Sequence, residues 1–244
     1  TLNVGRVHDA LVEYMVGQAE KRGVELRSVN PVVGECNDAS LNRITERVIG
    51  IPEVMSAMES AGVDFEEGDV GAGKGTTCFG LKGGIGSASR VFQVGTERYT
   101  LGVLVQSNFG STENLRIDGQ RVGRRIMREI APAALDKGSI MIVMATDLPA
   151  SDRQLARIIK RAGVGLARMG SYWGHGSGDI VIGFSTAQRI RAEERAGTVP
   201  FRMLNEKYID TVFQAMADAT EEAVLRSMLQ ADAVGNRRSL KEFL

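Results

Sequence analysis

The sequence predicts a layered α/β domain, because apolar strand-like runs alternate along the chain with segments of helical periodicity. Residues 140–145, Ile-Met-Ile-Val-Met-Ala, form a continuous apolar run that is typical of a strand buried on both faces. Residues 151–168 carry apolar side chains on one face of a helix. Residues 89–94 and 98–106 are rich in strand formers and predict a β-hairpin around Gly95.

The remaining elements follow from the same periodicities and from start and stop residues. Residues 5–22 predict a helix that ends at Gly23, and residues 51–61 predict a second helix with Pro52 near its start. The other expected elements are, in chain order, a glycine-rich loop over 64–86, a short charged helix within 121–129, a strand over 179–185 and a long helix over 205–231.

The composition is that of an ordinary globular protein. The 244 residues suffice for one large domain or two small ones, and 43% hydrophobic residues exclude disorder as the main state. Lysine plus arginine equals aspartate plus glutamate at 30 each, so the formal net charge is zero. Such a chain does not indicate a broad surface for nucleic acids or anionic membranes. No apolar run reaches membrane-spanning length.

The cysteines and histidines are too few for a disulfide framework or a metal centre. We expect Cys36 and Cys78 to be buried or half-buried thiols in a reducing compartment, which predicts a cytoplasmic location. Together with His8 and His175 they make no metal-ligand spacing.

The chain has 29 glycines, and they are most concentrated in residues 68–86 and 170–178, which makes both regions candidate sites. Residues 68–74 fit the start of a phosphate-binding loop, but the Ser or Thr that should follow is missing, and the motif neither follows a buried strand nor opens a helix. We interpret it as a packed glycine-rich loop. Residues 174–178 depart from the serine-hydrolase elbow, because His175 stands where that motif has glycine.

Gly138-Ser139 directly precedes the apolar run 140–145, and it belongs to a series of motifs in a fixed order. The series comprises residues 31–38, 69–73, 82–90, 103–110, 138–147, 176–186 and 219–223. From near Thr1 to about Leu229 it resembles the D-aminopeptidase and β-peptidyl aminopeptidase family, whose members cleave themselves to expose an N-terminal serine.

The resemblance implies a four-layer αββα sandwich, similar to the N-terminal-nucleophile (Ntn) hydrolases but with different connectivity. Residues 1–244 would form a single catalytic domain, in which self-cleavage separates an α-chain part, 1–138, from a β-chain part, 139–244. Members of the family begin well before the position of Thr1, so an N-terminal portion is expected to be absent here. The resemblance also implies no metal or organic cofactor, a short peptide or aminoacyl amide substrate, no nucleic-acid or membrane partner, and a homo-oligomer, typically a tetramer of α/β pairs.

The resemblance further implies the roles of individual residues. Ser139 would be the nucleophile once the bond after Gly138 is cut, and Asn108 would donate to the oxyanion. Ser177 and Asp179 would orient the nucleophile or relay protons. Three further residues are expected to contact substrate: Glu35 at its free amine, Asn37, where some relatives have Tyr, and Gly84.

The chemistry of an exposed N-terminal serine agrees with a chain that lacks a convincing catalytic triad. A free α-amine has a pKa near ~7.7–8.0, so it is partly neutral at neutral pH and can take the proton of the Ser139 hydroxyl. Gly138 suits the cut because it has no Cβ. Two alternatives stay open: acyl transfer of the ornithine acetyltransferase type, which typically uses Thr as nucleophile, and a non-catalytic nucleotide-binding module built on residues 68–74.

Overall fold

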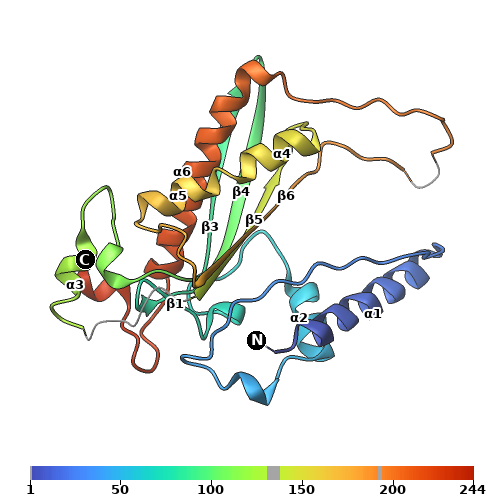
Figure 1. Ribbon diagram of the computed structural model, residues 1–244. Helices are drawn as coiled ribbons and strands as arrows, with labels where there is room; N and C mark the ends of the chain where they lie inside the picture. Colours follow the sequence, from blue (N-terminus) through green and yellow to red (C-terminus); the bar gives the residue numbers. More distant parts are fainter. Residues whose placement is uncertain (1, 131–137, 192–193) are drawn as a thin grey trace.

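The structure is a computed structural model that describes residues 2–130, 138–191 and 194–244, and a four-stranded sheet lies at its centre (Figure 1). The strands are β3 (Ile85–Val94), β4 (Glu97–Asn108), β5 (Gly138–Thr146) and β6 (Ser177–Ser185), in that order across the sheet. The pairs β3–β4 and β4–β5 are antiparallel, whereas β5–β6 is parallel. The predicted hairpin and both predicted strands are thereby confirmed, each with longer bounds than the sequence indicated.

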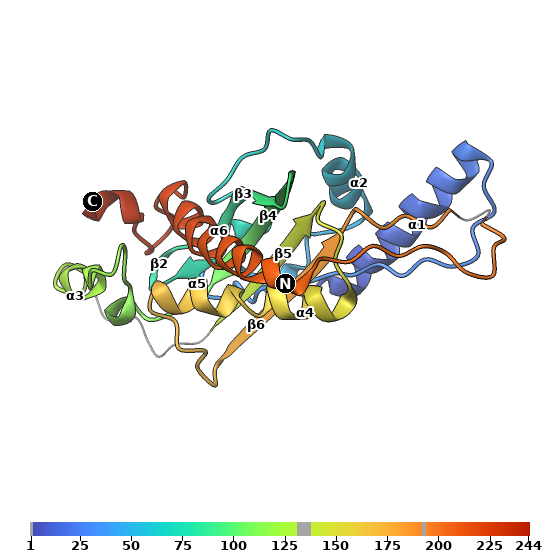
Figure 2. The same ribbon diagram turned by 90° about the horizontal axis from the view of Figure 1, so that it is seen from above.

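Three helices cover one face of the sheet: α4 (Asp152–Ile159), α5 (Ala162–Arg168) and α6 (Ile209–Leu229) (Figure 2). Helix α6 packs on β3 and β4, α5 packs on α6, and α4 packs on β6. The core between these layers contains Leu101, Val103, Val105, Ile140, Ile142, Met144, Val212, Met216, Ala219 and Ala223, all nearly or fully buried.

The predicted single helix over 151–168 is divided at residues 160–161. A Cβ on Gly165 would lie 2.5 Å from the carbonyl oxygen of Ala217 in α6, so α5 approaches α6 closely. Arg161, between the two helices, stacks its guanidinium over the ring of Phe213. The division therefore gives α5 its own direction against α6.

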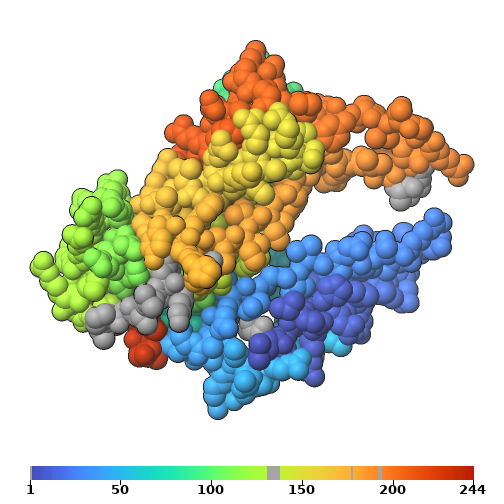
Figure 3. All heavy atoms as spheres, viewed as in Figure 1, coloured from blue at the N-terminus to red at the C-terminus, as the bar shows by residue number. Residues whose placement is uncertain are grey.

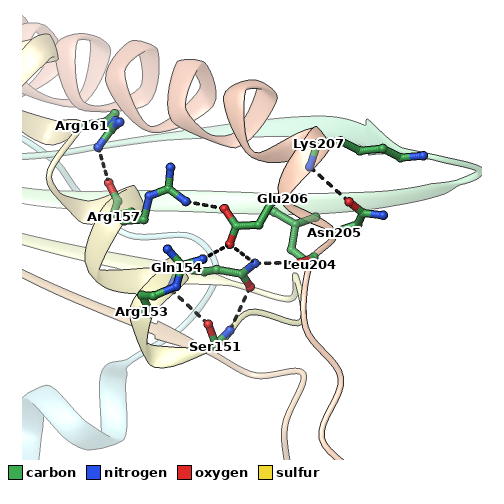
Figure 4. Close-up of polar contacts among 9 residues, drawn as sticks. All are labelled: Ser151, Arg153, Gln154, Arg157, Arg161, Leu204, Asn205, Glu206 and Lys207. Atoms are coloured by element: carbon green, nitrogen blue, oxygen red, sulfur yellow. Dashed lines mark hydrogen bonds and ion pairs between the residues drawn. The ribbon is translucent and has the colours of Figure 1, made fainter.

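A polar cluster around the buried Gln154 connects the first turn of α4 to the segment that precedes α6 (Figure 4). Gln154 is fully buried, and its Nε2 donates to the carbonyl oxygen of Leu204 at 2.7 Å and to Glu206 Oε1 at 2.9 Å. Glu206 also pairs with Arg153 and Arg157 on α4. The helical layer that supports β5 and β6 is thus tied together from two distant parts of the sequence.

The face of the sheet away from these helices, here called the open face, is only partly covered by the described residues. Side chains alternate along β5, so Ile140, Ile142 and Met144 are buried against the helices while residues 139, 141, 143 and 145 are only half-buried. The expectation that this strand is buried on both faces is therefore wrong for this chain. The described residues supply one helical layer and one four-stranded sheet layer.

The N-terminal part lies beside the sheet and returns to it. Helix α1 (Val4–Arg22) ends at Gly23 in the left-handed conformation and packs on α2 (Ile51–Ser60). Between them an extended segment runs back to the lower end of the sheet (Figure 1). In the space-filling view, α1 and residues 194–204 extend away from the rest of the described residues (Figure 3). Among the described residues, no helix combines the length and apolar character that crossing a bilayer requires.

The predicted glycine-rich loop holds a small two-stranded sheet of β1 (Thr77–Cys78) and β2 (Leu81–Lys82). The charged segment forms the short helix α3 (Val122–Ile126). Five 3₁₀ turns complete the described elements: Ile44–Glu46, Gly71–Gly73, Thr112–Asn114, Glu206–Tyr208 and Leu240–Phe243.

Candidate active site

Gly138 and Ser139 are the first two residues of β5, between β4 and β6. Ser139 lies directly opposite Asn108 on β4 and opposite Gly178 on β6, and Gly138 lies opposite Ser177. Because paired residues present their side chains to the same face, with Cβ atoms ~5 Å apart, Ser139 and Asn108 are cross-strand neighbours. Both lie on the face of the sheet away from the helices, where Ser139 is half-buried and Asn108 is almost fully buried.

The backbone of β4 leaves no room for a side chain immediately before Ser139. A Cβ added to Gly138 would lie 1.9 Å from the carbonyl oxygen of Asn108, a distance that real Cβ atoms do not show. The N–H of Gly138 donates to the carbonyl oxygen of Gly176 at 3.2 Å, which holds this residue between the two neighbouring strands. A glycine is therefore required at the residue that precedes the candidate nucleophile.

The Asn108 side chain is held in one orientation by two backbone groups. It is 4% exposed; its Oδ1 accepts from the N–H of Thr77 and its Nδ2 donates to the carbonyl oxygen of Asn37, both at 2.9 Å. Thr77 comes from β1, and Asn37 comes from the extended segment after α1. A carboxamide carries two N–H donors, so such a fixed amide suits recognition of a negatively charged oxygen.

The extended segment around Asn37 covers the beginning of β5. The buried Cys36 Sγ lies 3.6 Å from the carbonyl oxygens of both Gln106 and Ser139. Burial raises the pKa of the Cys36 thiol, which keeps it protonated and able to donate. Both cysteines are free and buried, as predicted, but the contact of Cys36 with the Ser139 peptide was not predicted. The one indication of this contact in the sequence is that Cys36 lies between two predicted substrate-binding residues, Glu35 and Asn37.

The predicted substrate-binding residues differ in exposure. Glu35 and Asn37 are exposed, and Asn37 Oδ1 accepts from the N–H of Ala39 at 3.0 Å, so its side chain turns back on its own segment. Gly84 is buried, and a Cβ there would lie 2.1 Å from the carbonyl oxygen of Gly68. This close approach explains the glycine by packing, and the contact of Gly84 with substrate stays a prediction.

Ser177 and Asp179 both lie on β6 beside the start of β5. The structure describes the backbone of Ser177 but not its side chain. Asp179 pairs with Ile140, whose side chain is buried against the helices. Strand alternation therefore places the Asp179 carboxylate on the opposite face from the Ser139 hydroxyl in this uncut strand. Its predicted role toward the nucleophile stays a prediction.

The structure does not place either of the two competing motifs in the context that the motif usually has. Residues 71–73 form a 3₁₀ turn that leads into the strands β1 and β2, so the glycine-rich loop does not open a helix as a phosphate-binding loop does. His175 lies in an exposed turn, and Ser177 after it begins a strand, whereas a hydrolase elbow places its serine between a strand and a helix. Among the described residues, no group of His, Cys, Asp and Glu has the geometry of a metal site.

Comparisons with known proteins relate this site to a family. The model of peptidase family S58 matches residues 1–241. Beta-peptidyl aminopeptidase BapA of Sphingosinicella microcystinivorans is 36% identical, with 96% of this chain and 62% of that protein covered. The chain thus spans less than two thirds of the length of this curated relative.

Solved structures show the same relationship. The PH0078 protein from Pyrococcus horikoshii OT3 has a TM-score of 0.89 and 44% identity, covering 98% of this chain and 67% of its own. The L-aminopeptidase D-Ala-esterase/amidase of Ochrobactrum anthropi has a TM-score of 0.88 and 39% identity, covering 96% and 64%, and is described as a new variant among the Ntn hydrolase fold. The predicted α/β class and its likeness to the Ntn hydrolases are confirmed. With the match to the family model over nearly its whole length, the chain belongs to peptidase family S58.

Proposed function

We propose that the protein containing this chain is a self-processing serine aminopeptidase that releases N-terminal residues from short peptides, amides or esters. The observation that carries the proposal is the pairing of Ser139 with Asn108 at the start of β5, where β4 admits only a glycine before the serine. A nucleophile, an amide donor and a peptide bond preceded by a residue without a side chain then meet at one place. The membership in peptidase family S58 supports this assignment.

The proposed self-cleavage uses the hydroxyl of Ser139 on its own preceding peptide. Oγ attacks the carbonyl carbon of Gly138, the C–N bond breaks, and the nitrogen takes a proton to become the α-amine of Ser139. The resulting ester is hydrolysed by water, which leaves a carboxylate on Gly138 and restores the hydroxyl. The same hydroxyl then attacks the carbonyl of a substrate, with the new α-amine as base and Asn108 as donor to the oxyanion.

The sheet supports the division into an α-chain part, 1–138, and a β-chain part, 139–244, that remain one folded unit. Strand β4 of the first part pairs with β5 of the second from Leu101 to Asn108, and α6 of the second part packs on β3 and β4 of the first. Breaking one peptide bond leaves these contacts in place. A tetramer of such α/β pairs and a cytoplasmic location complete the proposal.

The proposed substrates carry a free amine near the scissile bond. We assign this ammonium group to Glu35, because a cation in a cleft requires a carboxylate partner. The names of the relatives include β-peptidyl, L-aminoacyl and D-alanyl activities. A panel of L-, D- and β-aminoacyl p-nitroanilides, measured with the longer protein that contains this chain, distinguishes these three classes. The proposed reaction requires no metal or organic cofactor.

Active protein is expected to consist of two fragments, because the proposed hydrolysis of substrate uses the free α-amine of Ser139 as its base. The smaller fragment should begin Ser139-Ile140-Met141. Denaturing mass spectrometry and N-terminal sequencing of the purified protein measure both features. A single intact mass from fully active protein contradicts self-processing, and an intact chain that binds ATP points instead to the nucleotide-binding alternative.

The rising limb of the pH profile of kcat/KM is expected to follow an ionisation near ~7.7–8.0, because the α-amine of Ser139 acts as base only when it is neutral. His175→Ala should leave this ionisation in place, since His175 lies in an exposed turn outside the proposed proton path. His8→Ala, on the exposed side of α1, serves as the matched control. Loss of the ionisation in His175→Ala alone establishes a serine–histidine pair in place of the α-amine.

A further inference from the structure

Lys82 is a fully buried lysine beside the candidate site, and the predicted chemistry does not use it. Its Nζ donates to three backbone carbonyl oxygens: Gly73 at 2.7 Å, Thr76 at 3.1 Å and Gly83 at 2.6 Å. An ammonium group has three N–H donors, so these contacts account for all of them. Removing a charge from water is costly, and a neutral side chain would fill the same space at less cost.

One of these contacts connects Lys82 to Asn108 through a single peptide group and two hydrogen bonds. The carbonyl oxygen of Thr76, which accepts from Lys82, belongs to the same peptide group as the N–H of Thr77, which donates to Asn108 Oδ1 at 2.9 Å. A peptide group is planar, so fixing its oxygen also fixes the direction of its N–H. Hydrogen bonds in such a chain polarise one another, and a charged donor at one end strengthens the effect.

The groups around Lys82 affect the pKa of its side chain in opposite directions. Burial lowers the pKa of Lys82 to about 8, and the nearby carboxylates of Asp69 and Asp38 oppose this decrease, as does Cys78, whereas Lys74 adds to it. Below this pH the group is an ammonium ion. Above it, a neutral amine retains two N–H donors for three carbonyl oxygens.

The packing around the loop brings these charges together. A Cβ on Gly75 would lie 2.3 Å from Asp38 Oδ2, so the segment that provides Asn37 and the loop that provides Thr77 approach within contact distance. Asp38 is 4% exposed, and its Oδ2 accepts from Asn42 Nδ2 at 2.9 Å. The Asn108 amide therefore lies between the segment of Asn37 and the loop of Thr77, and these two segments also contact each other.

We propose that Lys82 is a positioning residue for the oxyanion donor: its ammonium group orients and polarises the Asn108 amide through the peptide group of Thr76 and Thr77. The inference rests on the proposed function, because it assigns Lys82 to the same reaction. Lys82 touches neither the substrate nor the reacting atoms and acts only through Asn108.

A double-mutant cycle tests the proposal in the full-length protein with an aminoacyl p-nitroanilide. Lys82→Met is expected to lower kcat about tenfold, the size of one lost charge-assisted hydrogen bond, with KM nearly unchanged. In the Asn108→Ala background, Lys82→Met should have no further effect beyond about twofold. Lys74→Met removes an exposed lysine from the same loop and should stay within about twofold of the wild type.

Each outcome of the cycle bears on one of the two proposals. A wild type that neither cleaves itself nor hydrolyses any substrate removes the proposed function, and with it this inference. An active wild type with equal losses on Lys82→Met in both backgrounds overturns the positioning role and leaves the proposed function standing. Where Lys82→Met does not fold, the wild-type kcat is expected to fall above about pH 8 and this fall to be absent in Asn108→Ala. An alkaline fall of equal size in both proteins overturns the inference.

Discussion

Ser139→Ala is expected to yield a folded, uncut and inactive protein. Without the hydroxyl, no group of this residue attacks either the carbonyl of Gly138 or that of a substrate. Loss of a covalent nucleophile lowers kcat by about 10⁶, so turnover should fall below detection. Ser139 is half-buried on the open face, and alanine preserves its pairing with Asn108, so the melting temperature should change little. Denaturing mass spectrometry and initial rates measure the two losses.

Two further variants test whether the losses in Ser139→Ala come from the missing nucleophile or from a disturbed fold. Ser139→Cys retains a nucleophile at the same atom position and is expected to process itself. Ser89→Ala removes an exposed hydroxyl from β3 of the same sheet and should both process and turn over normally. Cleavage at the same bond in Ser139→Ala means that another protease makes the cut, which contradicts the proposed mechanism.

The strands of this sheet and the helices that pack on it were largely predictable, because the spacing of apolar residues along the sequence determines them. The apolar run over 140–145 lies within β5, and the predicted hairpin forms with its turn at Gly95. The division of the helix over 151–168 was not predictable, because it depends on the close approach of Gly165 to α6. The half-exposure of Val143 likewise depends on which layers lie over each face, and a run of apolar residues does not encode it.

The candidate site depends even more on contacts between residues that are distant in the sequence, which local patterns do not predict. Resemblance to a family predicted Ser139 and Asn108, and the register between β4 and β5 brings them together. The groups that hold Asn108 come from residues 31 and 71 positions away in sequence, through backbone atoms that any residue type would provide. The burial of Lys82 has no signal in the sequence, because lysines in glycine-rich loops are usually exposed, whereas three carbonyl oxygens surround this one.

Asn108→Ala is expected to lower kcat by about 10²–10³, the usual effect of removing one oxyanion-hole donor. Self-cleavage should slow as well, because attack on the carbonyl of Gly138 passes through a similar tetrahedral oxyanion. The variant also leaves the N–H of Thr77 and the carbonyl oxygen of Asn37 without this partner, so a moderate loss of stability is expected. Initial rates, intact mass and the melting temperature are measured on the same preparation.

Asn108→Asp separates the donor role from this structural role. A carboxylate of the same shape retains an acceptor for the N–H of Thr77 but has no N–H to donate, and it faces the carbonyl oxygen of Asn37. Its kcat should fall at least as far as in Asn108→Ala. Asn114→Ala, which removes a carboxamide from the loop that follows β4, should keep normal turnover and serves as the matched control. Near-normal kcat in Asn108→Asp would exclude the amide from the reaction, because that variant has no N–H to donate to an oxyanion.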